Sequence, residues 1–208
     1  MNAHTLPLPL PPPPPATRRL CLLGGESAGK TTLAQALAQA LGTVWVAEYG
    51  RERWLDIGGT FSVEELLHVG CEQVVREDAA LPQADGWLVC DTSPLTTLVY
   101  SLLDHGRATP ELQALARRHY DLILLCAPDF TFVQDGARRD HGFRNEQHLL
   151  TLRLLQEFGL PHVLLHGELP ARLAQVLPLL AAPMPMPMPM TGPVPLSAPQ
   201  AQPAALSR

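Results

Sequence analysis

The chain has 208 residues, which is enough for one domain with a complete hydrophobic core and additional terminal segments. Its formal net charge is −5, so no excess of basic charge would attract nucleic acid or an anionic membrane surface. Of the 22 prolines, seven fall in residues 1–15 and eight follow residue 182. We therefore expect a disordered proline-rich arm over 1–16, one folded domain over 17–182 and a disordered Pro/Met-rich tail over 183–208.

Neither end of the chain has the pattern of a membrane segment. The N-terminal apolar residues are interrupted by proline and have no basic residues before them, unlike a secretory signal. The alternating prolines and methionines of 183–190 cannot form a membrane helix. Both ends are typical of extended polyproline-type segments, which are either solvated or make weak protein contacts.

A phosphate-binding loop of the form G-x-x-x-x-G-K-[ST] spans residues 24–31. Residues 20–23 predict a buried strand before it, and apolar residues at helical spacing after it predict a helix that ends at Gly42. Backbone N–H groups and the helix N-terminus of such a loop bind phosphate oxygens. The motif therefore predicts ATP and Mg²⁺ as cofactors. The expected nucleotide-binding residues are Gly25, Glu26, Ser27, Ala28, Gly29, Lys30, Thr31 and Thr32.

Lys30 is the only lysine in the sequence, and all other basic side chains apart from histidine are arginine. A compact ammonium on a slim stem fits between phosphates inside the loop, where a planar guanidinium would not. We expect Lys30 to reach the β- and γ-phosphates and the Thr31 hydroxyl to hold Mg²⁺.

Residues 43–47 predict a second strand, and the sequence Glu-Tyr-Gly-Arg-Glu follows it at 48–52. Ligands of open α/β sheets bind at the carboxyl ends of the strands, so these side chains are candidate site residues. The alternative is a helix start with acidic residues in its first turn.

Residues 62–80 predict a helix, with Ser62 and Glu65 spaced as a capping box. His68 and Glu72 lie four residues apart on this helix. They form either half of a metal site or part of a solvated surface, and the sequence shows no further ligand nearby.

Residues 87–91 predict a buried strand that ends in Asp91, as a Walker B strand does, with a helix following through residue 103. Asp91 would either cap that helix or face the phosphate loop and bind Mg²⁺. Thr92 or Ser93 is available for capping instead.

The remaining elements continue the alternation of strands and helices. Helices are predicted over 110–119, 144–158 and 168–180, and strands over 121–126 and 162–165. The charged segment 129–142 is either a surface loop or a lid that supplies arginines to a transferring phosphoryl group. The whole pattern predicts an α/β, P-loop NTPase-type three-layer fold with a mainly parallel sheet of about five strands.

The four cysteines show no C-x-x-C spacing. Cys21, Cys90 and Cys126 lie in predicted strands, where a thiol is usually a small buried apolar group. Free thiols are typical of a reducing compartment, so we expect a cytoplasmic protein.

Several motifs together resemble a known family. They are GGESAGKTT at 24–32, EYGRE at 48–52, Asp91-Thr92, and Asp135-Gly136-x-Arg138. In this order they resemble the ribosylnicotinamide kinase domain at the C-terminus of the bacterial NAD-biosynthesis regulator and its wider AAA-type ATPase/kinase family. The resemblance covers about residues 18–180, and the short arm before Arg18 suggests a stand-alone kinase domain.

The resemblance implies transfer of the ATP γ-phosphate to the 5′-hydroxyl of nicotinamide riboside, which gives nicotinamide mononucleotide in NAD salvage. Lys30, Mg²⁺ and the lid arginine Arg138 would neutralise the phosphates, and one carboxylate would accept the proton of the acceptor hydroxyl. Glu48 is the first choice for that base and Asp91 the second. The expected substrate-binding residues are Glu48, Tyr49, Arg51, Asp91 and Asp135. The alternatives are a kinase for another nucleoside and a P-loop ATPase that acts as a regulatory or assembly switch.

Overall fold

The structure is a computed structural model, and it describes residues 17–131 and 139–181. The predicted arm and tail, and the predicted site residues Asp135 and Arg138, lie outside these ranges.

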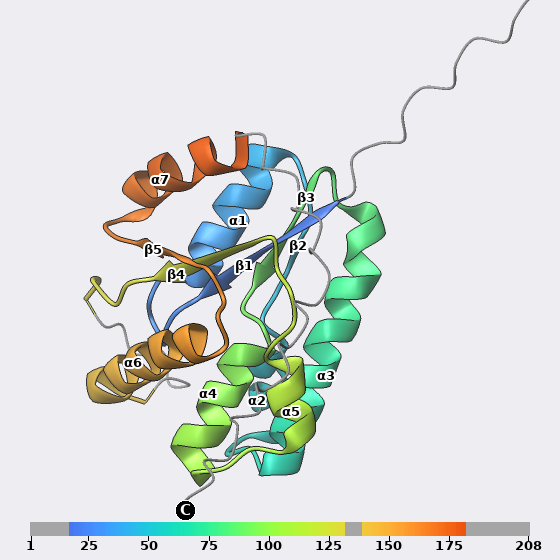
Figure 1. Ribbon diagram of the computed structural model, residues 1–208, viewed down its shortest axis with the longest axis vertical. Coiled ribbons are helices and arrows are strands. Elements are labelled where there is room, and N and C mark those ends of the chain that lie inside the picture. Colours follow the sequence, from blue (N-terminus) through green and yellow to red (C-terminus); the bar gives the residue numbers. More distant parts are fainter. Residues whose placement is uncertain (1–16, 132–138, 182–208) are drawn as a thin grey trace, which may run out of the picture.

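Five parallel strands form one sheet in the described part of the chain, in the order β2-β3-β1-β4-β5 (Figure 1). The strands are β1 Arg18–Leu23, β2 Trp45–Val46, β3 Trp87–Asp91, β4 Leu122–Cys126 and β5 Val163–Leu165. The helices are α1 Lys30–Leu41, α2 Tyr49–Ile57, α3 Val63–Ala80, α4 Pro94–His105, α5 Pro110–Leu115, α6 His141–Glu157 and α7 Leu169–Ala181, with a 3₁₀ turn η1 at Leu81–Gln83. The predicted fold class is confirmed.

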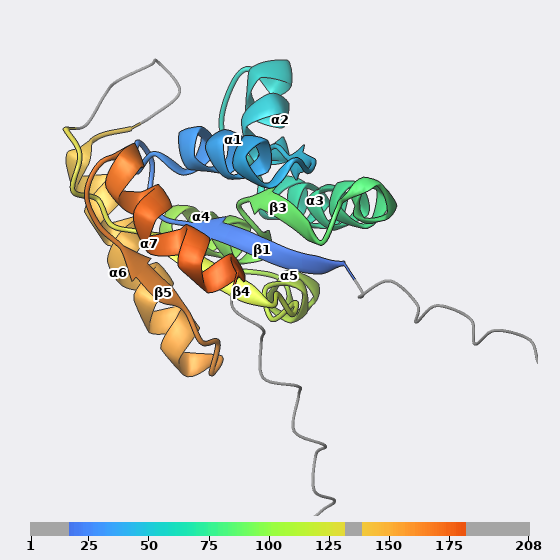
Figure 2. The same cartoon turned by 90° about the horizontal axis from the view of Figure 1, so that it is seen from above.

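The sheet is buried on both faces, because side chains of its central strands alternate between two apolar layers. In β1, Leu20 and Leu22 pack toward α1 and α7, whereas Cys21 and Leu23 pack toward α3, α4, α5 and α6. In Figure 2, α1 lies on one side of β1 and α5 on the other. The three predicted strand cysteines, Cys21, Cys90 and Cys126, are buried free thiols, as expected.

Local signals predicted most helix boundaries. Gly42, in the left-handed region at φ 66°, ends α1 by donating its N–H to the Ala38 and Gln39 carbonyls. Ser62 accepts a hydrogen bond from the Glu65 N–H, so one half of the predicted capping box is present at the start of α3. Ser93 caps α4 through the Leu95 N–H, which leaves Asp91 available for the site.

Three predicted elements differ from the observed ones by three or more residues in length or at one end. Strand β2 has two residues where five were predicted, because it is an edge strand paired only with β3. Helix α5 ends at Leu115 rather than near residue 119, because Arg117 and Arg118 already bond to carbonyls three residues back. Helix α6 begins at His141 rather than residue 144, because Asp140 caps it through the Phe143 N–H.

No helix in the part of the chain that the structure describes is long and apolar enough to cross a membrane.

Candidate active site

The phosphate loop turns sharply between β1 and α1, and two of its glycines are required by close packing. A Cβ on Gly24, whose φ is 143°, would lie 2.8 Å from the Cys126 carbonyl oxygen. A Cβ on Gly25 would lie 2.7 Å from the carbonyl oxygen of Arg144. Lys30 is the first residue of α1, and its Nζ donates to the Gly25 carbonyl at 3.1 Å, back across the loop. The ammonium is thus held at the mouth of the loop, where phosphates bind in this motif.

Asp91 lies beside the phosphate loop because β1 and β3 are neighbours, with Leu22 in register with Asp91. The Thr31 hydroxyl donates to Asp91 Oδ2 at 2.6 Å. Asp91 Oδ1 is buried and has no hydrogen-bond partner among the described residues. A hydroxyl and a carboxylate with an unused oxygen form a donor set that fits Mg²⁺, which takes oxygen ligands. Burial raises the pKa of Asp91, and Lys30, Thr31 and Arg51 oppose that rise.

Thr92, directly after Asp91, has a backbone conformation that the sequence does not predict. Its φ is 86°, in the left-handed region that β-branched residues rarely adopt. Its side chain lines the candidate cavity, and its buried Oγ1 has no hydrogen-bond partner among the described residues. Strained residues of this kind cluster at functional sites, because surrounding structure must hold them there.

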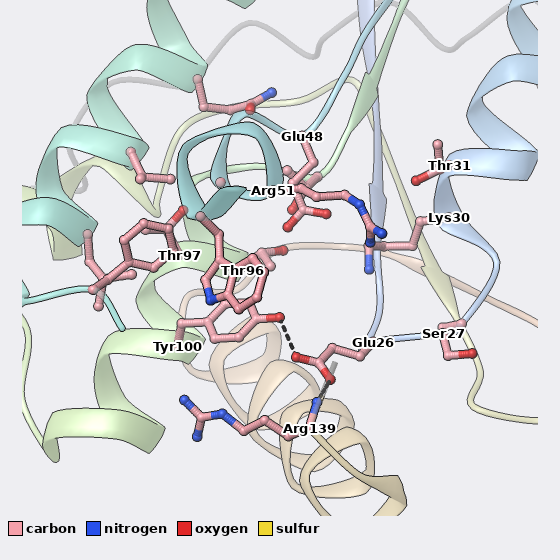
Figure 3. A pocket seen from close by; sticks show the side chains of 18 of the residues that line it. Glu26, Ser27, Lys30, Thr31, Glu48, Arg51, Thr96, Thr97, Tyr100 and Arg139 are labelled. Atoms are coloured by element: carbon pink, nitrogen blue, oxygen red, sulfur yellow. Dashed lines mark hydrogen bonds between the residues drawn. The ribbon is translucent and has the colours of Figure 1, made fainter. Parts of the chain in front are cut away.

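The start of α2 carries Glu48 and Arg51 into the same space as Lys30, as Figure 3 shows. A buried amide holds this helix start: the Tyr49 N–H donates to Gln73 Oε1 at 3.0 Å, and Gln73 Nε2 donates to Glu77 at 3.4 Å. Glu48 is therefore both the N-cap position of α2 and a residue that lines the candidate cavity, so the two interpretations of the 48–52 motif are compatible.

A cavity of about 420 Å³ joins the phosphate loop to the region between α2, α3 and α4. Predicted site residues Glu26 to Thr32, Glu48 and Arg51 line it. The opposite wall is formed mainly by aromatic, aliphatic and hydroxyl side chains. These are Trp54, Phe61, Leu66, Val69, Thr96, Thr97 and Tyr100. The site thus has a charged end suited to phosphates and a less polar end suited to a ring.

Glu26 connects the two ends of this cavity. Its carboxylate accepts hydrogen bonds from the Tyr100 hydroxyl at 3.0 Å and from the Arg139 N–H at 2.8 Å (Figure 3). The Arg139 side chain pairs with Asp104 on α4 at 2.7 Å. Burial, with Glu48 and Glu26 nearby, raises the pKa of Tyr100 well above its ordinary value, so its hydroxyl remains a donor at neutral pH.

Some predicted residues are placed away from the cavity. The Tyr49 ring packs against α3, bonds His68 through its hydroxyl at 3.2 Å and lies under the Arg76 guanidinium. Tyr49 does not line the cavity, nor do Gly25 and Asp91. His68 and Glu72 do not share a ligand site, because His68 bonds Tyr49 whereas Glu72 pairs with Arg76. Among the described residues, no group of three or more His, Cys, Asp or Glu could hold a metal ion.

The aromatic and hydroxyl wall was missed by sequence reasoning. Thr96, Thr97 and Tyr100 lie in the first turns of α4, whose sequence predicts a buried apolar helix, whereas Trp54 lies in α2 and Phe61 in the connection to α3. For the α4 residues, only their position directly after the Asp91 strand could have pointed to a site, because ligands bind beyond the carboxyl ends of such strands.

The comparisons with known proteins agree with this geometry. Residues 19–172 match a family described as AAA domain. The trifunctional NAD biosynthesis/regulator protein NadR of Escherichia coli strain K12 is 30% identical over 170 residues, which are 77% of this chain and 41% of NadR. NadR of Salmonella typhimurium strain LT2 is 32% identical over 138 residues, 63% of this chain and 33% of that protein. The chain therefore spans less than half the length of these relatives.

Two solved structures share the fold. The crystal structure of NadR protein in complex with NR superposes with a TM-score of 0.65 and 26% identity, covering 74% of this chain and 44% of NadR. Thymidylate kinase from Ehrlichia chaffeensis gives a TM-score of 0.61 at 16% identity, covering 80% of this chain and all of the kinase, a likeness of fold alone. With its phosphate loop, the strand that ends in Asp91 and all but the first residue of its parallel sheet inside the matched residues 19–172, the chain belongs to the AAA domain family.

Proposed function

We propose that this chain is an ATP-dependent kinase that phosphorylates the 5′-hydroxyl of nicotinamide riboside and produces nicotinamide mononucleotide. The observation that carries the proposal is the single cavity that joins the phosphate loop to an aromatic and hydroxyl wall, with Glu48 between them. The NadR structure with NR, which we interpret as nicotinamide riboside, supports this choice of acceptor. A cavity of about 420 Å³ lies within the size range of small-molecule sites.

At the phosphate end, the loop N–H groups and the N-terminus of α1 would bind the ATP phosphates, and Lys30 would neutralise their charge. Thr31 and Asp91 would hold Mg²⁺, which supplies charge neutralisation for the β- and γ-phosphates when bound. The Thr31–Asp91 hydrogen bond of 2.6 Å supports this pairing, because both oxygens already face one point beside the loop.

At the acceptor end, Glu48 would orient the 5′-hydroxyl and accept its proton. Glu48 lines the same cavity at the start of α2, whereas the carboxylate of Glu26, in the loop itself, already accepts hydrogen bonds from the Tyr100 hydroxyl and the Arg139 N–H. Arg51, which lines the same wall, would contact the substrate. The proposed roles of Arg138 in catalysis and Asp135 in substrate binding stay predictions, because both lie outside the described residues.

The domain organisation and the location are also proposals. We propose that 17–182 is the catalytic unit, that 1–16 and 183–208 take no part in it, and that the protein works in the cytoplasm. The buried free thiols Cys21, Cys90 and Cys126 support a reducing compartment.

A thermal-shift panel tests the proposal. The protein is heated with AMP-PNP and Mg²⁺ in the presence of nicotinamide riboside, adenosine, uridine, cytidine or thymidine. We expect saturable stabilisation by nicotinamide riboside and formation of nicotinamide mononucleotide when ATP replaces AMP-PNP. Stabilisation by another nucleoside alone would indicate a different nucleoside kinase. Stabilisation by nucleotide with no response to any nucleoside would indicate an ATPase switch.

A further inference from the structure

A buried arginine on the last helix lies directly behind the phosphate loop. Arg172, in the first turn of α7, has a side chain that is 1% exposed. Nη1 donates to the Ala28 carbonyl of the loop at 2.5 Å, and Nη2 donates to the Ala127 carbonyl after β4 at 2.9 Å. The loop is thus tied to a helix that follows it by more than a hundred residues in the sequence.

The contact with Ala28 fixes the direction of a peptide group in the loop. The carbonyl of Ala28 and the N–H of Gly29 belong to one trans peptide, in which the two groups point in opposite directions. Because Arg172 holds the carbonyl on its own side, the Gly29 N–H faces away from Arg172. Gly29 has φ 77° and is the N-cap of α1, where N–H groups bind phosphate.

The guanidinium is itself held in place by a second set of contacts. Its Nη2 pairs with Asp129 Oδ1 at 2.7 Å, and Asp129 Oδ2 accepts from the Gly167 N–H after β5 at 2.7 Å. Burial opposes ionisation of Asp129, but the Gly167 N–H and Arg172 together lower the pKa of this carboxyl below its ordinary value. The Phe130 ring lies over the guanidinium, with the ring centre 4.4 Å from the Arg172 Cζ.

These contacts need an arginine rather than any cation. The two terminal nitrogens of the guanidinium together donate to three acceptors, and a lysine ammonium is a single compact point charge that lacks this fork. Burying a charge is costly unless it is paired and hydrogen-bonded, so a purely packing role would be served better by an apolar side chain.

We propose that Arg172 is a positioning residue that sets the direction of the Gly29 N–H in the phosphate loop and thereby determines the affinity for the nucleotide. The inference rests on the proposed function only in taking a nucleoside triphosphate as the ligand of the loop.

The experiment compares Arg172→Met and Arg172→Lys with Arg118→Met as a matched control. Arg118 precedes β4, at the amino ends of the strands and not at the carboxyl ends where the phosphate loop lies, and it pairs with the buried Glu77 and with Asp78 of α3. AMP-PNP with Mg²⁺ is titrated by calorimetry in the absence of any acceptor, and melting temperatures are recorded for all proteins. Where turnover is found, KM is measured separately for ATP and for nicotinamide riboside.

We expect Arg172→Met to weaken AMP-PNP binding by about tenfold or more, because it removes charged hydrogen bonds that orient a phosphate donor. Arg172→Lys should give a smaller loss, and the KM for nicotinamide riboside should stay near that of the natural protein. Arg118→Met should lower the melting temperature and leave AMP-PNP affinity unchanged.

The inference is overturned if Arg172→Met binds AMP-PNP within about twofold of the natural protein, or if the KM values of both substrates rise together. Should Arg172→Met fail to fold, Arg172→Lys decides the question in the same titration. Because the titration contains no acceptor, its result does not depend on whether nicotinamide riboside is the substrate.

Discussion

At the scale of single residues, the site depends on a few charges that the fold holds at defined points. Lys30 is the clearest example, because its Nζ donates a hydrogen bond to the Gly25 carbonyl of its own loop. Its side chain takes no part in either apolar layer of the core. The role that we propose for its charge is therefore phosphate binding and not packing.

We predict that Lys30→Ala abolishes turnover and leaves the fold intact, as measured by product formation and by calorimetry. Lys30→Arg should restore little activity, because a guanidinium is too broad for the space between phosphates. A lost unfolding transition in Lys30→Ala, or near-natural activity in Lys30→Arg, would contradict this account of the loop.

A second prediction at this scale concerns Glu48. Glu48→Gln keeps the shape of the side chain and removes its ability to accept a proton. We expect kcat to fall by roughly 10²–10⁴-fold, the usual size of general-base assistance, with ATP affinity unchanged. The matched control is Glu52→Gln, which alters an exposed carboxylate on α2, the helix that Glu48 caps; this carboxylate pairs with Arg76 of α3. A small loss of kcat with a large rise in nucleoside KM would make Glu48 a binding residue.

Asp91 should respond differently, because its Oδ2 accepts from the Thr31 hydroxyl and the residue does not line the cavity. We predict that Asp91→Asn shifts the Mg²⁺ dependence of the rate to higher concentration, and that excess metal partly restores activity. The measurement is the rate as a function of Mg²⁺ at saturating ATP. If the loss does not depend on metal while Glu48→Gln stays active, the two roles are exchanged.

At the scale of elements, α3 is joined to β4 by a buried carboxylate. Glu77 is 0% exposed and accepts from the Tyr120 hydroxyl at 2.8 Å, and it also pairs with Arg118 at 3.3 Å. Through Gln73, the same carboxylate reaches the start of α2 and thus the helix that carries Glu48. Burial raises the pKa of Glu77 to about 7, although Tyr120, Arg118, Gln73 and Arg19 oppose the rise.

The raised pKa predicts how stability depends on pH. The folded state binds the Glu77 proton more tightly than the unfolded state does, so this contribution is complete below pH 4.5 and is lost as pH rises through about 7. Between these two pH values the free energy of unfolding falls by about 3 kcal/mol, because one pKa unit corresponds to about 1.36 kcal/mol.

We therefore compare the free energy of unfolding of the natural protein with that of Glu77→Gln. Between pH 5 and 8 the natural protein should lose about 3 kcal/mol relative to the variant, so the variant is favoured at high pH. Denaturant unfolding at several pH values measures this difference, and other titrating groups cancel in it. Glu72→Gln, on the exposed face of α3, is the control. A difference that does not change with pH would show that Glu77 is ionised throughout.

At the scale of the whole molecule, residues of 17–131 and 139–181 form two apolar layers, one on each face of the sheet. We predict that a protein of residues 17–182 folds and turns over like the 208-residue chain. Its melting temperature should change by no more than about 2–4 °C, which is what 1 kcal/mol produces at this size. A larger fall would show that the terminal residues pack on the domain.

The sequence by itself determined the fold class, the phosphate loop, the Asp91 strand and most helix ends. These depend on local chemistry: the glycines of 24–29, the cap at Ser62, the left-handed Gly42 and continuous apolar runs in strands buried on both faces. Such signals lie within a few residues of one another, so one stretch of sequence contains all of the necessary information.

Only the tertiary structure decided what surrounds the loop. Tyr100 faces Glu26 across 74 residues, and Arg172 reaches Ala28 across 144. Tyr49, a predicted substrate residue, turns toward α3, because Gln73 and His68 bond its backbone and hydroxyl. These placements follow from the order of the strands in the sheet and from packing between helices distant in sequence, and no local pattern encodes either.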